Sequence, residues 1–288
     1  FDINECIKIR NIELITRHDV KAVEYYLQKK FEELNMKRYI PYIHFGLTSQ
    51  DINTTAILIG LKNSINKIVK TLEILLNILK KRINMWKDMI ILSRTHGQPA
   101  VPTIMGKEIL VFYNRLLNQV ENLKSIKYIT KFGGAVGNLN AHYVAFPTID
   151  WINILNAFTK NIFQMERNKY TTQIENYDNM AYILDNLKKI NSIILDLDVD
   201  MWLYISNDYF KQNIQEEEVG SSTMPHKVNP IDFENSEGNL TIAVSFLECL
   251  ARKLPRSRLQ RDLTDSTILR NLGSILSYCM IGYNSTIR

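Results

Sequence analysis

The segment from Gly220 to Pro230, G-S-S-T-M-P-H-K-V-N-P, holds the residue types best suited to chemistry. Two adjacent serines beside the glycine can approach a ligand closely, and Lys227 supplies a fixed positive charge. The prolines at 225 and 230 restrict the backbone between them. Gly, Ser and Pro also mark plain connections. The composition therefore predicts either a linker or a mobile flap that carries reactive side chains.

Five histidines interrupt the helical pattern at His18, His44, His96, His142 and His226, and none lies inside a long periodic stretch. Histidines that fill a core would not be distributed in this way, so the pattern favours an enzyme that uses acid–base chemistry. His96 stands between Thr95 and Gly97 and has little apolar packing to do, which favours a functional role. His18 stands near a predicted helix start, where a structural role is the more common one.

Other kinds of catalytic site match the sequence poorly. No H-E-x-x-H, paired-cysteine or clustered-carboxylate spacing occurs, so no metal is expected. The serines at 221 and 222 lack the second glycine and the strand of a hydrolase nucleophile turn, and phosphate-loop and dinucleotide fingerprints are absent. The three cysteines, Cys6, Cys249 and Cys279, are scattered and fit a reducing, intracellular compartment.

Long helices must position these residues. From Ile52 to Ile91 apolar side chains step by three or four, which predicts one helix of roughly 40 residues, about 60 Å long. Its stripe cannot be buried by one helix alone, so a bundle is required; the stripe comprises Leu61, Ile65, Ile68, Leu72, Leu75, Leu79, Ile83, Trp86 and Ile90.

Further helices are predicted over 104–129, 150–167, from the 170s to 210, and from 232 or 235 to 254, with Ser49 capping the long one. The opening segment is predicted to be helical, with a break at residues 16–19. Alternation typical of strands is hardly found. The sequence predicts an all-α fold, an antiparallel bundle of long helices that packs further on oligomerisation.

The totals exclude several classes of protein. The chain has 288 residues and a formal net charge of +5, with lysines spread along helical faces, so nucleic-acid binding has weak support. No stretch approaches the ~18 consecutive apolar residues of a membrane span, and the first residues form no secretory signal. We expect a soluble, cytoplasmic protein that acts on a small anionic substrate.

The segment 220–230 resembles the G-S-S-x-M-P-x-K-x-N-P motif of the fumarase/aspartase superfamily. Its continuation at 231–239, I-D-F-E-N-S-E-G-N, resembles the bacterial type of the adenylosuccinate lyase branch. Three more stretches are similar to that superfamily: T-S-Q-D-I-N at 48–53, T-H-G-Q at 95–98 and G-A-V-G-N-L-N-A-H at 134–142. The resemblance covers nearly the whole chain.

The residue types present suit the elimination that this family catalyses. A base must remove a proton from the carbon next to a carboxylate, and an acid must protonate the departing nitrogen. Ser221 is the expected base, assisted by Lys227, in a flap that closes and excludes water. Spacing does not distinguish Ser221 from Ser222, and the family pattern favours the first. His96 is the expected acid, oriented by Glu234.

The resemblance implies cleavage of adenylosuccinate to AMP and fumarate, and of the succinocarboxamide SAICAR to AICAR, without a cofactor. It also implies a homotetramer in which three subunits form each active site. Lys227 and Asn229 would hold carboxylate oxygens. The full substrate-binding set it implies is His18, Asp19, His44, Thr48, Ser49, Gln173, Ser222, Asn229, Asn235, Arg261, Ser266 and Arg270.

Residues 1–41 are expected to be the remainder of an N-terminal helical domain, and 42–288 a central bundle domain. Family members are longer at both ends, so the resemblance implies that an Arg-Tyr pair and a small C-terminal helical domain are missing and that this chain alone is not fully active.

Two alternatives stay open: another lyase of the superfamily, such as argininosuccinate lyase or fumarase, and a helical scaffold without activity. The stretches 232–239 and 261–266 favour adenylosuccinate.

Overall fold

The computed structural model describes residues 2–213 and 228–288, and the chain divides into two compact units. Unit 1 comprises Phe1–Lys62, Lys127–Asn179 and Ser257–Asp262; unit 2 comprises Asn63–Ile126, Met180–Arg256 and Leu263–Arg288. The predicted domain boundary after residue 41 rests on family likeness and stays a prediction.

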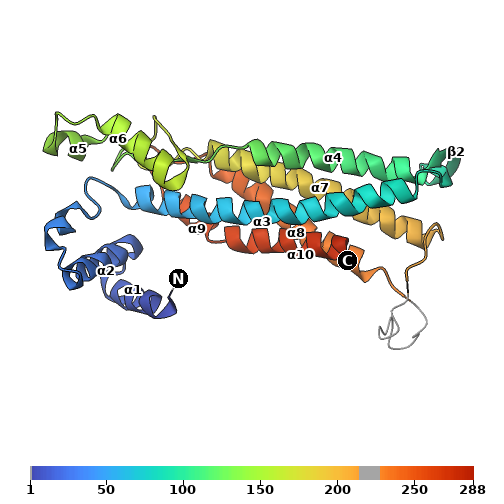
Figure 1. Ribbon diagram of the computed structural model, residues 1–288, viewed down its shortest axis with the longest axis horizontal. Coiled ribbons are helices and arrows are strands. Elements are labelled where there is room, and N and C mark those ends of the chain that lie inside the picture. Colours follow the sequence, from blue (N-terminus) through green and yellow to red (C-terminus); the bar gives the residue numbers. More distant parts are fainter. Residues whose placement is uncertain (1, 214–227) are drawn as a thin grey trace. The chain divides into compact units, whose positions relative to one another are not determined.

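Unit 2 is a bundle of long helices (Figure 1). It contains most of α3 (Ser49–Met85) and α7 (Asp178–Ser206), together with α4 (Met105–Ser125), α8 (Ile231–Lys253), the short α9 (Thr264–Leu269) and α10 (Leu272–Ile287). Pairs of contacts show that neighbours run antiparallel. Asp232 meets Arg288 and Asn235 meets Ser285 between α8 and α10, so residue numbers rise on one helix as they fall on the other. The predicted all-α bundle is confirmed.

The core of unit 2 follows the predicted helical period. On α3 the side chains from Ile65 to Leu79 at three- and four-residue steps are buried, and α4 buries its predicted face. The corresponding residues of α7, α8 and α10 complete the core; they include Leu187, Ile190, Ile194, Leu240, Leu247, Leu250, Ile275 and Tyr283. Burying such side chains contributes about 1.5–3 kcal/mol each, which stabilises helices that could not persist alone.

The predicted long helix is wrong at its C-terminal end. It stops at Met85, and residues 90–104 form an antiparallel hairpin of β1 (Ile90–Thr95) and β2 (Gln98–Ile104). The start of α4 binds the chain just beyond this end, because the Gly106 N–H donates to Trp86 O at 3.0 Å. A Cβ on Gly106 would lie 2.7 Å from Ile83 O, so only glycine allows this approach. Ile90, predicted in the buried stripe, is instead 76% exposed.

Unit 1 consists of shorter elements. They are α1 (Ile3–Thr16), α2 (Asp19–Glu33), the 3₁₀ helix η1 (Lys37–Tyr42), the first turns of α3, β3 (Ile129–Thr130), α5 (Asn140–Ala145), α6 (Trp151–Phe158), the π-helix η2 (Thr159–Phe163) and β4 (Glu166–Arg167). The predicted break at 16–19 is confirmed. The predicted helix from 150 to 167 ends early, because it widens into η2 and then pairs as β4 with β3.

An apolar cluster of Phe132, Leu139 and Leu155 holds the irregular part of unit 1 together, with Tyr143 and Trp151 packed against it. Among the described residues, no helix is long and apolar enough to cross a membrane.

Candidate functional site

The predicted site residues divide between the two units. Ser221, Ser222 and Lys227 lie outside the described residues. Unit 1 carries the first group: His18, Asp19, His44, Thr48, Ser49, Gln173 and Arg261. Unit 2 carries the second: His96, Asn229, Glu234, Asn235, Ser266 and Arg270.

His18 caps the N-terminus of α2. Its Nδ1 accepts the backbone N–H of Lys21 at 3.2 Å, and its ring is exposed. The neighbouring Asp19 lies within reach of the first turns of α3, because Asn53 Nδ2 donates to its carboxylate at 3.4 Å. The capping role expected of a histidine at this position is present, and the second ring nitrogen, Nε2, takes no part in it.

His44 pairs with Glu24 of α2. Its Nδ1 lies 3.1 Å from Glu24 Oε2, while its Nε2 is buried without a hydrogen-bond partner among the described residues. Burial by itself would raise the pKa of Glu24, but hydrogen bonds from Lys21 and His44 outweigh it and hold the pKa below its ordinary value. A charged Glu24 thus orients the His44 ring.

Thr48 and Ser49 stand at the N-terminus of α3. The helix begins at Ser49, so the capping position falls on Thr48, one residue earlier than predicted. The Asp51 carboxylate reaches back to accept the Thr48 N–H at 2.7 Å, an arrangement similar to a capping box. The amides and hydroxyls of such a helix start suit an anion.

Asp51 itself is fully buried and forms an ion pair with Lys131, which is fully buried too. The distance from Lys131 Nζ to Asp51 Oδ1 is 2.7 Å. The same carboxylate accepts the Gly133 N–H at 2.8 Å. Burial lowers the pKa of Lys131, and the Asp51 charge opposes that shift.

Arg261 is held against the first turn of α3. Its Nη1 and Nη2 lie 2.7 and 3.0 Å from the Gln50 side-chain oxygen, with the amide oriented toward the guanidinium. The residue before it, Gln260, accepts the backbone N–H of Gln173 at 3.3 Å. Two residues predicted to bind substrate, Gln173 and Arg261, are thereby brought to one part of unit 1.

The Gly133–Gly137 loop packs closely on this part of unit 1. A Cβ on Gly134 would lie 2.8 Å from Gly46 O, and one on Gly46 would lie 2.5 Å from the His142 ring. His142 is buried, stacks edge-on against Phe45 and Trp151, and has its pKa lowered by burial. These contacts give His142 a packing role.

In unit 2, His96 occupies the turn of the β1–β2 hairpin. It is exposed, and its side chain forms no hydrogen bond with the described residues. Glu234, predicted to orient His96, instead accepts a hydrogen bond from Trp202 Nε1 at 3.0 Å. The described structure therefore does not bring Glu234 to His96 through a hydrogen bond, and its orienting role stays a prediction.

The remaining predicted residues of unit 2 lie near helix ends. Asn235 Nδ2 donates to Ser285 Oγ at 2.6 Å, which ties α8 to α10. The Ser266 backbone N–H donates to Asp265 at 2.7 Å in α9. Arg270 is exposed at the end of α9.

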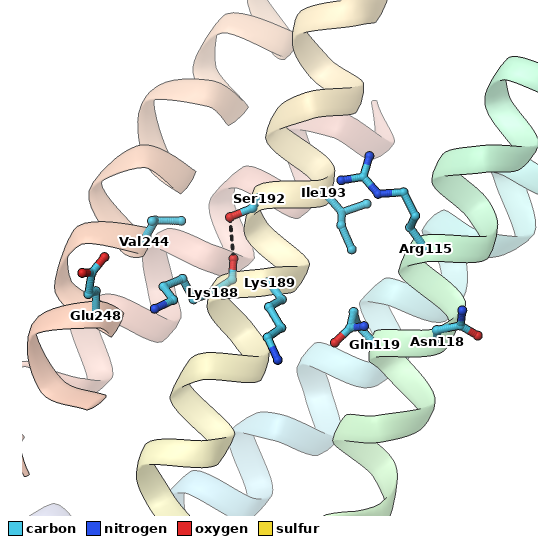
Figure 2. Close-up of a pocket in the computed structure, with 9 residues that line it drawn as sticks. All are labelled: Arg115, Asn118, Gln119, Lys188, Lys189, Ser192, Ile193, Val244 and Glu248. Atoms are coloured by element: carbon cyan, nitrogen blue, oxygen red, sulfur yellow. Dashed lines mark hydrogen bonds between the residues drawn. The ribbon is translucent and has the colours of Figure 1, made fainter. Parts of the chain in front are cut away.

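Two hollows lie within unit 2. One, of about 510 Å³, is lined by Asn229 and Asp232 together with residues of α3, α7 and α10. One of its lining residues, Asn229, is predicted to bind the substrate. Figure 2 shows the other, of about 580 Å³, between side chains of α4, α7 and α8 that include Arg115, Lys189 and Glu248. None of the predicted site residues lines it.

Gln50, Asp51 and Lys131 are not among the site residues predicted from the sequence. The one signal available was that Gln50 and Asp51 adjoin Thr48 and Ser49. In residues 2–213 and 228–288, no group of three or more His, Cys, Asp or Glu side chains is placed to hold a metal ion.

The sequence model of a family described as "Lyase" matches residues 1–244, and one described as "Adenylosuccinate lyase C-terminal" matches residues 257–288. The chain is 49% identical to an adenylosuccinate lyase of Dictyostelium discoideum, 47% to one of Legionella pneumophila and 44% to one of Escherichia coli. Each match covers 100% of this chain and 63% of the relative, so the chain spans less than two thirds of their length.

The crystal structure of 3-carboxy-cis,cis-muconate lactonizing enzyme from Pseudomonas putida is similar in fold, with a TM-score of 0.78 at 19% identity, covering 100% of this chain and 62% of that one. Both the helical architecture and the sequence matches agree with the predicted resemblance. The chain belongs to the lyase family, and over its whole length it is similar to the adenylosuccinate lyase branch.

Proposed function

We propose that the chain is the greater part of an adenylosuccinate lyase, a C–N lyase that releases fumarate from adenylosuccinate to give AMP, and from SAICAR to give AICAR. The observation that carries this proposal is the 43–49% identity to adenylosuccinate lyases over all of the chain. The 257–288 match to the C-terminal family of the same name supports that substrate over argininosuccinate.

The chemistry assigns each residue one step. Ser221, as alkoxide, takes the proton from the succinyl carbon that adjoins the carbon bonded to nitrogen. Lys227 and Asn229 stabilise the negative charge that develops on the carboxylate attached to this deprotonated carbon. The electron pair forms the C=C bond of fumarate as the C–N bond breaks. His96 gives the nitrogen its proton. No cofactor is needed, because every proton and electron comes from the substrate or these side chains.

In this proposal, the nucleotide part of the substrate binds to residues of unit 1. Thr48 and Ser49 open a helix of 37 residues, whose free amides and dipole favour an anion. Arg261 is fixed through its bonds to Gln50 and supplies a guanidinium for a phosphate or carboxylate. His18 and Asp19, at the start of α2, and His44, held by Glu24, are placed at neighbouring element ends and would contact the base or ribose.

The proposed assembly is a homotetramer whose sites are shared between subunits. Two observations on the described chain support it. His96 projects from an exposed hairpin without a side-chain partner, and Glu234 is engaged by Trp202. A second copy would supply what His96 lacks. The protein would act in the cytoplasm, without a nucleic-acid or membrane partner.

The direct test is a spectrophotometric assay of the full-length protein that contains this chain, with adenylosuccinate, argininosuccinate and malate. Preference for adenylosuccinate supports the proposal, preference for argininosuccinate moves the chain to that lyase, and no turnover with any of them supports a scaffold. Ser221→Ala should abolish turnover while AMP binding and the helical circular dichroism persist. Near-normal turnover in that variant would remove Ser221 as the base.

Sharing of the site is tested by mixing two inactive variants, His96→Gln and Ser221→Ala. If each site takes these residues from different subunits, mixed oligomers contain some sites with both residues intact, and part of the activity returns. Activity that stays absent in mixtures shown by mass spectrometry to exchange subunits would place both residues in one subunit's site.

A further inference from the structure

Asp51 links two segments that are distant in sequence. Its Oδ2 accepts the Thr48 N–H at 2.7 Å, and its Oδ1 accepts the Gly133 N–H at 2.8 Å and the Lys131 ammonium at 2.7 Å. The Gly134 N–H lies 3.2 and 3.3 Å from the two oxygens. Only a carboxylate can accept on both sides at once, because both of its oxygens are acceptors.

Lys131 completes the link from the other side. Its ammonium also donates to Gly134 O, so it fastens the glycine loop at a second point. Both members of the ion pair have side chains that are 0% exposed. A buried pair of this kind contributes little net stability compared with apolar residues, but removing one partner leaves an uncompensated charge. The effect of the pair is therefore best sought in the positions of the two segments that it joins.

The segment that the pair holds is the one that carries Thr48 and Ser49. Gln50, between Ser49 and Asp51, holds the Arg261 guanidinium. Within the four-residue turn from Thr48 to Asp51, Asp51 therefore fixes the backbone and Gln50 fixes the side chain of Arg261. Displacing Asp51 would move three proposed substrate contacts together, namely Thr48, Ser49 and Arg261.

We propose that Asp51 and Lys131 are positioning residues that hold the Thr48–Ser49 turn and the Gly133–Gly134 loop in one arrangement, the one in which the turn receives the nucleotide. The role in nucleotide binding rests on the proposed function. The role in fixing the two segments does not.

The test compares Asp51→Asn, Lys131→Met and the double variant. An asparagine at 51 has one acceptor oxygen and one NH₂ group, so it can satisfy Thr48 or Gly133 but faces the other with a donor. Lys131→Met leaves the Asp51 charge buried and unpaired. The double variant has removed both charges of this pair, so its thermal midpoint should return toward the wild-type value. The link between the two segments stays broken.

In the double variant we expect KM for adenylosuccinate to rise about tenfold or more, equivalent to ~1.4 kcal/mol of binding, with a much smaller change in kcat. Hydrogen exchange at the amides of 48–51 and 133–134 should accelerate. Leu116→Ala, a cavity in the core of α4, serves as control: it lowers the thermal midpoint but should leave KM and these amides unchanged.

A double variant that regains both its midpoint and wild-type exchange at these amides would overturn the proposal, since the pair would then be structural only. Wild-type KM with accelerated exchange would overturn its role toward the nucleotide. If the full-length wild-type protein does not cleave adenylosuccinate, the proposed function fails, and hydrogen exchange still decides whether the pair fixes the two segments.

Discussion

His96 and Gly97 are the two central residues of the turn that joins β1 to β2, and both have positive φ, 53° and 72°. Thr95 pairs with Gln98 across them. Positive φ at both central positions is what a two-residue hairpin turn of type I′ requires, because its twist matches that of the strands. The proposed acid is thus held by a rigid turn whose second residue must tolerate this conformation.

We expect Gly97→Ala to lower both stability and kcat. A Cβ at this position would meet no atom within 4 Å, so the cost is that of the left-handed backbone alone, about 1 kcal/mol. Any relaxation of the turn moves His96, and a displacement near 1 Å can reduce a rate by roughly a hundredfold. Steady-state kinetics and urea unfolding measure the two effects.

Gly60→Ala is the matched control, because a Cβ there also meets nothing within 4 Å but the residue lies inside α3. It should raise stability by about 1 kcal/mol and leave kcat unchanged. If Gly97→Ala keeps full kcat despite lost stability, the turn does not position His96.

Two substitutions separate the capping and binding roles of His18. His18→Asn should keep the cap, since asparagine is among the best residues there, whereas His18→Ala should cost about 1 kcal/mol. If the ring also contacts substrate, both variants raise KM. A KM that rises only in the less stable alanine variant would show that His18 is a cap and nothing more.

Asp198 should make stability depend on pH. Burial between α7, α8 and α10 raises its pKa to about 7, against hydrogen bonds from Ser236 and Thr286 that lower it. The folded state then holds a proton that the unfolded state has released. The contribution of Asp198 to the free energy of unfolding is therefore fully present below about pH 4. It is lost as the pH rises to about 7, and the loss is roughly 4 kcal/mol at most.

Asp198→Asn should remove this part of the dependence of stability on pH. It should also raise the thermal midpoint at pH 8 relative to the parent chain. Asp196 lies on the same helix as Asp198 and forms a half-exposed ion pair with Arg115 of α4, so Asp196→Asn should leave this pH dependence of stability in place. Equal pH profiles for the parent and Asp198→Asn would show that folding does not change the pKa of Asp198.

Gly282 sets the approach of α10 to α8. A Cβ there would lie 2.5 Å from Leu240 Cδ2 and 2.6 Å from its Cγ. We expect Gly282→Ala to cost about 1–3 kcal/mol by overpacking. In a double-mutant cycle with Leu240→Ala, the smaller side chain should recover part of that loss, and simple additivity would contradict this packing.

Much of the fold follows from the sequence because helices are local. The three- and four-residue period predicted the buried faces of α3 and α4, and the residues at 16–19 predicted the break where His18 caps α2. The β1–β2 hairpin escaped prediction. Apolar spacing up to Ile90 continues the helical period, and whether residues 90–104 pair with each other depends on how α3 and α4 meet at Gly106.

The sequence by itself determined which residue types are available for the reaction and that they fall where the helical period is interrupted, as at Thr48, His96 and Asn229. Only the tertiary structure decided that Asp51 pairs with Lys131, that Gln50 holds Arg261, and that Glu234 meets Trp202. Such partners lie tens to hundreds of residues apart. No local period encodes them, because a buried charge finds its partner through the packing of the whole unit and not through its neighbours in the chain.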